Sequence, residues 1–168
     1  MNEEQIEANN AEIEQIKGNK SVRKRITNEC RILYKLFPFV ILQSVSNELV
    51  LSVSEIINNK KCTYKFILSN KYPFEQPKIY YNNHKYSGML KITGDFAKTL
   101  LKNATGKECL CCYSLNCKDN WSPHFMLSNI IDEIKNTAKF RRYIINMLFV
   151  KKIKEKYNIP YANIECYL

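Results

Sequence analysis

Three apolar runs, FVILQSV (39–45), ELVLSVSEI (48–56) and CTYKFILS (62–69), decide the fold of this chain. Each run is short and rich in β-branched or aromatic residues, and residues of turn composition separate it from the next. Apolar side chains alternate along the second and third runs, as in strands with one buried face. They are Leu49, Leu51 and Val53 in one run, and Tyr64, Phe66 and Leu68 in the other. The short connections predict antiparallel hairpins.

A fourth strand is expected after an interruption. The segment NKYPFEQP (70–77) contains two prolines, which cannot donate to a strand ladder, whereas KIYYN (78–82) again has strand composition. The sequence therefore predicts a four-stranded antiparallel meander sheet.

Helical periodicity lies on both sides of these strands. From Ser21 to near Pro38, one helix face holds Val22, Ile26, Cys30 and Leu33. After the strands, FAKTLLKNATG (96–106) predicts a short helix closed by its glycine. Beyond Pro123, two apolar stripes predict C-terminal helices. The first stripe is Leu127, Ile130, Ile131 and Ile134, and the second is Phe140, Tyr143, Ile144, Met147 and Leu148. Helices segregated from an antiparallel sheet indicate an α+β fold.

The length of 168 residues suits a single domain with one core. We expect this domain to cover residues 21–158. Residues 1–20 carry five glutamates and few apolar groups, so they predict a flexible or helical acidic lead-in. Residues 159–168 are expected to form a C-terminal tail.

The formal net charge of +10 raises the possibility of nucleic-acid binding, which needs clustered Lys and Arg. The basic residues are instead scattered through every segment, and only residues 22–25 and 140–142 concentrate charge. A solvated basic surface is therefore the expectation, and no nucleic-acid partner is predicted.

The sequence also bears on the compartment. No stretch has the length and apolarity of a bilayer span, and the acidic N-terminal segment is unlike a signal peptide. The seven cysteines are an odd number, which argues against a disulfide framework. We expect a protein of the cytoplasm or nucleus with reduced thiols and no membrane partner.

The segment GKECLCCYSLNCKDNWSP (106–123) holds four cysteines, namely Cys109, Cys111, Cys112 and Cys117. One of them is a candidate nucleophile, because even a small thiolate fraction at neutral pH reacts strongly. The structural alternative is that cysteines fill space as small apolar groups, which is what we expect of Cys30 and Cys62. Zinc binding by all four thiolates is a further alternative. Its spacing is not that of a standard site, since paired Cys-x-x-Cys chelation is usual and adjacent cysteines are expected to point in different directions.

Four motifs, in order, resemble the ubiquitin-conjugating enzyme family over roughly residues 21–133. VRKRITNECRIL (22–33) resembles its first helix, and YPFEQPKI (72–79) resembles its Tyr-Pro-Phe-x-Pro-Pro-Lys loop. GKECL (106–110) resembles the active-site segment Gly-x-x-Cys-Leu, and NWSPHFMLSNII (120–131) resembles the Trp-Ser-Pro loop into the second helix. The CLCC variant in a chain of this composition also resembles conjugating-enzyme-like proteins of large DNA viruses.

The resemblance implies a ubiquitin-conjugating-like fold and an acyl transfer through a cysteine thioester. Ubiquitin or a ubiquitin-like modifier would arrive from the activating enzyme on Cys109 and leave for a lysine or a ligase. Cys111 and Cys112 are the alternatives to Cys109. No metal or small-molecule cofactor is implied, because ATP is consumed upstream.

The resemblance also implies two partner surfaces. Arg23, Lys24 and Arg25 stand where the family meets its activating enzyme, although a solvated helix face explains them equally well. Phe74, Ser122 and Pro123 stand where RING-type ligases bind. Trp121 is expected to anchor the second loop, and His124 to lie on the surface.

The chain departs from the family near the nucleophile. The His-Pro-Asn tripeptide, whose Asn steadies the oxyanion, is absent, and Asn103 is the candidate substitute. Twelve positions separate Cys109 from Trp121, where the family usually has eight. Two other functions therefore remain open: a catalytically inactive conjugating-fold module that binds ubiquitin or a ligase, and a zinc-stabilised interaction domain.

Overall fold

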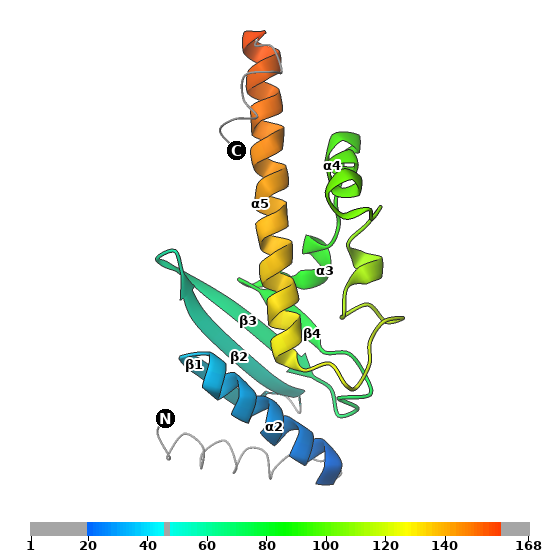
Figure 1. Ribbon diagram of the computed structural model, residues 1–168. Helices are drawn as coiled ribbons and strands as arrows, with labels where there is room; N and C mark the ends of the chain where they lie inside the picture. The colour runs from blue at the N-terminus through cyan, green and yellow to red at the C-terminus, as the bar shows by residue number, and fades with distance from the viewer. Residues whose placement is uncertain (1–19, 46–47, 159–168) are drawn as a thin grey trace.

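The computed structural model describes residues 20–45 and 48–158. The acidic lead-in, apart from its last residue, and the tail expected over 159–168 lie outside the described residues. The chain between them forms an α+β fold with a helix first, an antiparallel sheet next and a long helix last (Figure 1).

The sheet has five strands in the order β1-β2-β3-β4-β5, each paired antiparallel with its neighbours in sequence. They are β1 (Phe39–Val45), β2 (Glu48–Ile57), β3 (Lys60–Leu68), β4 (Lys78–Tyr81) and β5 (His84–Lys85). The meander was predicted, but its expected count of four strands was wrong. The fifth strand is too short for alternation to reveal it, and it returns through a turn at Asn82 and Asn83, both with positive φ.

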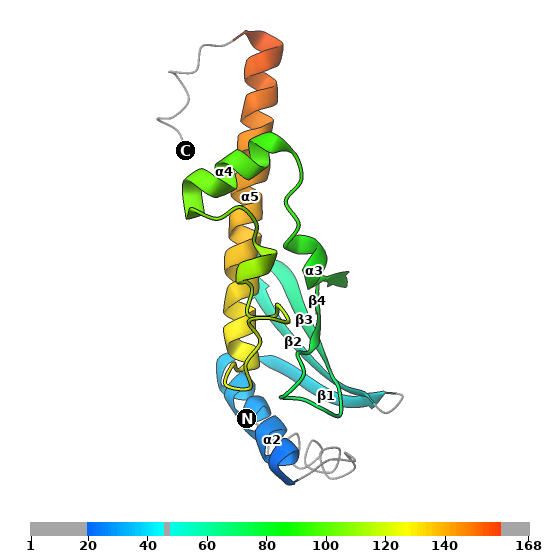
Figure 2. The same ribbon diagram turned by 90° about the vertical axis from the view of Figure 1, so that its right-hand side faces the viewer.

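One face of the sheet is covered by helices. Helix α2 (Lys20–Leu36) and the first half of α5 (Leu127–Tyr157) lie on this face, as the two perpendicular views show (Figure 2). Helix α3 (Tyr86–Met89) follows β5, and α4 (Asp95–Thr105) lies beside the second half of α5. The 3₁₀ helix η1 (Cys111–Tyr113) lies in the connection between α4 and α5.

The predicted stripes form the core between these layers. The α2 stripe, the alternating residues of β2 and β3, and the first α5 stripe are all buried. Cys30 and Cys62 are buried there too, so their prediction as core residues is confirmed. The apolar periodicity was therefore sufficient to identify the packed faces.

The C-terminal helices predicted from two stripes are one continuous helix of 31 residues, which corrects the expectation. The stripes differ because the packing partner changes along α5: sheet and α2 come first, and α4 follows. No Gly or Pro lies between them to end the helix. Arg141 holds the middle of α5 by donating from Nη1 to the carbonyl oxygens of Met89 (2.8 Å) and Lys91 (3.1 Å).

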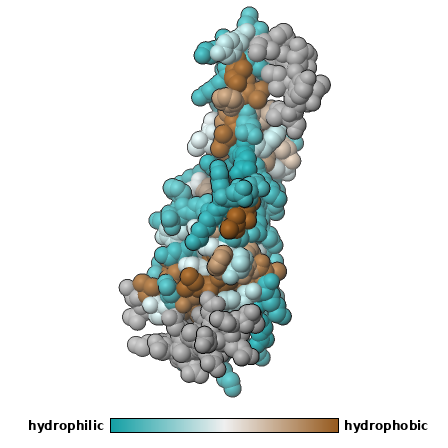
Figure 3. Space-filling model, turned by 90° about the vertical axis from the view of Figure 1, so that its left-hand side faces the viewer, coloured by the Kyte–Doolittle hydropathy of each residue, from teal (hydrophilic) through white to brown (hydrophobic). Residues whose placement is uncertain are grey.

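Some large apolar side chains remain exposed. Figure 3 shows hydrophobic surface low on the face that it presents and along the upper part of the molecule, with mostly hydrophilic surface and a smaller hydrophobic spot between. Among the described residues, the exposed large apolar side chains include Phe39, Ile41 and Val45 of β1, and Ile145 and Phe149 of α5. Among the described helices, none combines the length and the apolarity that crossing a bilayer requires.

Candidate functional site

Three cysteine thiols converge on one point of the surface. The Sγ atom of Cys109 lies 3.0 Å from that of Cys112 and 3.2 Å from that of Cys111, and the last two are 3.8 Å apart. We call Cys109, Cys111 and Cys112 the cysteine triad. Cys111 and Cys112 are exposed and Cys109 is partly exposed. The expectation that adjacent cysteines point apart was wrong, because the tight turn of η1 brings both sulfurs to Cys109.

The triad contains the Cys-x-x-Cys pair of Cys109 and Cys112, which sequence reasoning overlooked. Cys117 does not belong to it. Within the described residues, the only group of cysteine, histidine or acidic side chains close enough to share a metal ion is the triad itself. The four-thiolate zinc site considered from the sequence is therefore not assembled.

Local backbone geometry explains how the chain reaches this point. Gly106 ends α4 with a positive φ of 69°, and its N–H donates to the carbonyl of Lys102 at 2.8 Å. Leu110, directly after Cys109, packs against the core. The chain then turns through η1, where the N–H of Ser114 donates to the carbonyl of Cys111 at 3.3 Å.

The thiols of Cys109 and Cys112 differ in pKa. Hydrogen bonds from the side chain and backbone of Cys112, and from Cys111, hold the pKa of the Cys109 thiol below its ordinary value. The neighbouring Cys109 and Cys111 sulfurs raise the pKa of Cys112 to about 12. Of this pair, Cys109 is therefore the first to become a thiolate, and its role as the nucleophile stays a prediction.

Glu133 of α5 fastens the segment that follows the triad. Its Oε1 accepts hydrogen bonds from the hydroxyls of Ser114 and Tyr86, both at 2.6 Å, and its Oε2 accepts the Leu115 N–H at 2.6 Å. Ser114 and Tyr86 are buried. Sequence reasoning missed Glu133, although an acidic residue beside the buried Ile134 is the kind of signal that marks a polar contact at a helix edge.

A second carboxylate, that of Glu29, fastens the Trp-Ser-Pro end. Glu29 is fully buried, and its Oε1 accepts hydrogen bonds from Arg25 Nε (2.9 Å) and the Tyr72 hydroxyl (2.7 Å). Its Oε2 accepts the N–H of Leu127, the first residue of α5, at 3.0 Å. This carboxylate links α2, α5 and residues 70–77, which we call the proline loop. The sequence did not reveal this role.

The structure gives Arg25 a different role from the one implied by resemblance. Its Nη1 donates to the Pro123 carbonyl at 2.7 Å and its Nη2 to the Phe125 carbonyl at 2.5 Å, so its guanidinium is committed within the chain. Lys24 is exposed and Arg23 is half-buried. Binding of the activating enzyme by the α2 basic residues stays a prediction, and Lys24 is its most accessible member.

The two loops of the expected ligase surface are joined. Trp121 packs against the core and donates from Nε1 to the Pro73 carbonyl at 2.8 Å, which confirms its prediction as an anchor. Phe74 is 75% exposed, whereas Ser122 and Pro123 are half-buried. His124 is exposed as expected. The arrangement leaves Phe74 free for contact, and ligase binding stays a prediction.

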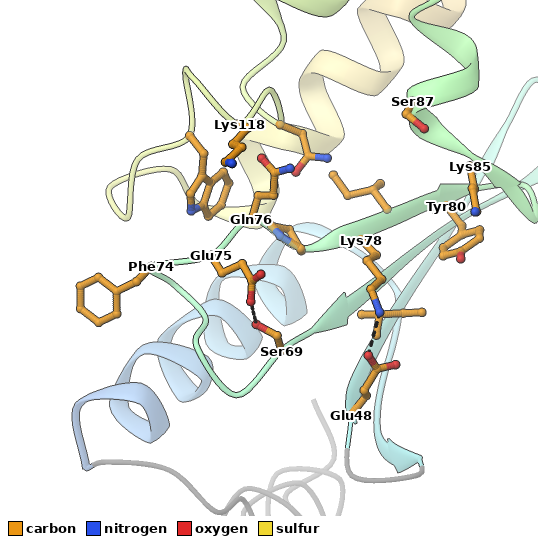
Figure 4. Close-up of a pocket in the computed structure, with 15 residues that line it drawn as sticks. Glu48, Ser69, Phe74, Glu75, Gln76, Lys78, Tyr80, Lys85, Ser87 and Lys118 are labelled. Atoms are coloured by element: carbon orange, nitrogen blue, oxygen red, sulfur yellow. Dashed lines mark hydrogen bonds and ion pairs between the residues drawn. The ribbon is translucent and has the colours of Figure 1, made fainter.

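Two grooves flank the segment between α4 and α5. The larger, of about 750 Å³, lies between the proline loop and residues 116–121; Figure 4 shows Lys118 and Gln76 within it and Phe74 at its outer end. The smaller, of about 550 Å³, is lined by residues that precede and follow the triad in sequence, but by none of the triad cysteines. Its lining combines the cysteine segment and α5, with Leu110, Tyr113, Asn129, Asp132 and Asn136.

Asn103 lies on the exposed side of α4, six positions before Cys109. Among the described residues, the hydrogen bonds of the triad sulfurs join them to one another, and none reaches Asn103. Asn120 instead supports the segment, by donating from Nδ2 to the carbonyls of Cys112 (2.7 Å) and Ser114 (3.2 Å). The role of Asn103 in oxyanion support stays a prediction.

Comparisons with known proteins find no relative of this chain. No protein family, curated protein or solved structure matches the chain.

Proposed function

We propose that this protein is a ubiquitin-conjugating-like transferase that carries ubiquitin, or a ubiquitin-like modifier, as a thioester on Cys109. The observation that carries the proposal is the placing of Cys109: a partly exposed thiol on a surface segment that Glu133 and Glu29 fasten on both sides of Trp121. An initial helix, a meander sheet, a cysteine segment and a further helix follow in the order of a conjugating enzyme.

The chemistry is an exchange of thioesters. The Cys109 thiolate attacks the carbonyl carbon of the modifier's C-terminal thioester, and the activating enzyme's cysteine leaves as a thiolate. An amine of a substrate lysine then attacks the new thioester. The Cys109 thiolate leaves, an amide bond forms, and the amine gives up a proton. Neither step requires a metal or an oxidant.

The smaller groove supports this proposal. Its lining includes Leu110, which follows Cys109 in sequence, and Asn129, Asp132 and Asn136 of α5. Asparagine side chains donate and accept hydrogen bonds, so they suit the backbone of an extended peptide. The C-terminal end of a modifier would lie here with its last carbonyl at the nucleophile.

A second candidate is a catalytically inactive conjugating-fold module that binds a modifier or a ligase. Two observations favour it: within the described residues no hydrogen bond of the triad sulfurs reaches Asn103, and the Arg25 guanidinium is engaged within the chain. This module would keep the exposed Phe74 surface and form no covalent intermediate.

Incubation with activating enzyme, ATP and ubiquitin, followed by non-reducing electrophoresis, separates the two. The enzyme gives a ubiquitin adduct that a thiol reductant removes. Cys109→Ser abolishes this reductant-sensitive adduct, whereas the matched control Cys117→Ser keeps it. Panels with other modifiers extend the test.

The remaining outcomes are equally informative. Loss of the adduct only in Cys111→Ser or only in Cys112→Ser would identify that residue as the nucleophile in place of Cys109. Absence of an adduct with every modifier contradicts the enzyme proposal and leaves the binding module, which a pull-down with ubiquitin or RING domains then tests.

A further inference from the structure

The cysteine triad has a property that thioester chemistry does not need: three sulfurs rather than one. A nucleophile requires a single accessible thiol, yet Cys111 and Cys112 add two more within 3.8 Å of each other and of Cys109. Within the described residues, no histidine or acidic side chain joins the three sulfurs. The site thus offers sulfur ligands alone.

Sulfur ligands select the kind of ion. Thiolates favour zinc and other soft or borderline cations, whereas magnesium and calcium prefer oxygen. Zn–S bonds of about 2.3 Å in a tetrahedral site place neighbouring sulfurs about 3.8 Å apart. Cys111 and Cys112 already have this separation, at 3.8 Å. The other two sulfur pairs need to open by less than about 1 Å.

The close spacing of the three ligands in sequence keeps the entropic cost of binding the ion low. All three ligands lie within four consecutive residues, so the ion closes only a very short loop. The Gly106 helix end before them, and the Glu133 contacts to Ser114 and Leu115 after them, fix both flanks of the segment. The exposed positions of Cys111 and Cys112 leave an open path for the ion.

We propose that Cys109, Cys111 and Cys112 bind one zinc ion through three thiolates, with the fourth coordination position open to solvent. Binding is a ligand exchange in which Zn²⁺ gives up bound water and each of the three thiols releases one proton to solvent. Neither oxidation nor reduction is involved. The site differs from a four-cysteine zinc knot because Cys117 lies outside it.

The zinc site is independent of the proposed transferase activity but limits it. One Cys109 sulfur cannot hold both zinc and an acyl group. If Cys109 is the nucleophile, bound zinc therefore excludes the thioester, and a chelator restores it.

Zinc titration of the full-length, fully reduced protein tests the proposal. The experiment uses anaerobic buffer and competition with a chromophoric zinc chelator. The expected result is one equivalent bound per chain. Loss of a contact that only supports a metal ligand already lowers metal affinity roughly tenfold. Serine at any triad position removes a ligand itself, so it should weaken zinc binding by more than this. The matched control Cys117→Ser retains wild-type affinity.

Cobalt substitution provides a direct readout of ligation. Co²⁺ bound by the triad gives sulfur-to-metal charge-transfer absorption in the near ultraviolet, which the triad variants lose and Cys117→Ser keeps. Circular dichroism establishes that each variant is folded. The proposal is overturned if folded, reduced wild type binds no stoichiometric zinc, or if Cys117→Ser lowers affinity as much as the triad variants.

Neither measurement uses activating enzyme or ubiquitin. Zinc binding together with the absence of a ubiquitin adduct in chelator-treated protein therefore supports the metal site and contradicts the transferase. An adduct in chelator-treated protein without zinc binding gives the reverse conclusion.

Discussion

The two ends of the segment between α4 and α5 are built on opposite principles. At the Trp121 end, the buried Glu29 accepts three hydrogen bonds from three different parts of the chain. At the triad end, the sulfurs lie at the surface, with two of them exposed. Buried, satisfied polar groups specify one structure, whereas an exposed cluster leaves its atoms available for reaction. The comparison teaches that stability and chemistry can be altered separately.

The largest expected effect is at Glu29. Glu29→Ala leaves the Arg25 guanidinium, the Tyr72 hydroxyl and the Leu127 N–H without their shared acceptor, so unfolding free energy should fall by about 3–5 kcal/mol. Urea denaturation monitored by Trp121 fluorescence measures it. The matched control is Glu108→Ala, which removes an exposed ion pair with Lys102 and should change stability by less than about 1 kcal/mol. Equal losses of unfolding free energy in both variants would contradict the expectation that the buried Glu29 contributes more to stability than an exposed ion pair.

Trp121→Phe should have the next largest effect. The substitution removes the Nε1 donor, so the Pro73 carbonyl loses its 2.8 Å hydrogen bond, and the smaller ring leaves part of its site unfilled. A loss of about 1–3 kcal/mol is expected in the same denaturation assay, followed by circular dichroism. Phe74→Ala, on the loop that Trp121 holds, removes an exposed ring and should stay within about 0.5 kcal/mol.

Ser114→Ala probes the boundary between the two ends. It removes one of the hydrogen bonds to Glu133, and Tyr86 and Leu115 keep the other two, so a loss of about 1–2 kcal/mol is expected. Amide hydrogen exchange across residues 107–117 should also rise. Thr99→Ala is the control on an exposed helix hydroxyl. Unchanged exchange in Ser114→Ala would show that the triad segment is held by other contacts.

The last prediction concerns the reactivity of two thiols, Cys109 at the surface and Cys30 in the core. Near neutral pH, iodoacetamide should modify Cys109 before Cys30, because the Cys109 pKa is lowered and a larger fraction is thiolate. Burial, and then the neighbouring Glu29, raise the pKa of Cys30 to about 12. Peptide mass mapping should find Cys30 labelled only after unfolding. Early labelling of Cys30 would show that the α2 core opens readily.

The sequence predicted the parts of this molecule that follow a period. The α2 stripe and the hairpins were both found, because apolar spacing reports directly which face is buried. The Trp121 anchor was found from its large apolar side chain in the Trp-Ser-Pro loop. The two-residue β5 was missed, since alternation cannot appear in two residues. The continuous α5 was divided because its packing partner changes along its length.

The site was less predictable than the fold. Cys109 was predicted as the nucleophile from its motif, and this role stays a prediction. The convergence of Cys111 and Cys112 on Cys109 depends on η1, a turn without a periodic signal. Glu29 and Glu133 were missed as anchors because their partners are distant in sequence: Leu127 lies 98 residues after Glu29, and Tyr86 lies 47 residues before Glu133. Long-range polar contacts depend on the completed fold, which residue spacing does not encode.

The sequential order of the strands has a consequence for the kinetics of folding. Each strand pairs with the next along the chain, so the hairpins close short loops, whereas the contact of Glu29 with Leu127 closes one of 98 residues. Loop closure costs about 0.6 kcal/mol more for each doubling of length. We therefore expect the sheet to form before α5 docks. Substitution at Glu29 should then accelerate unfolding more than it slows folding, as for any contact that forms after the transition state.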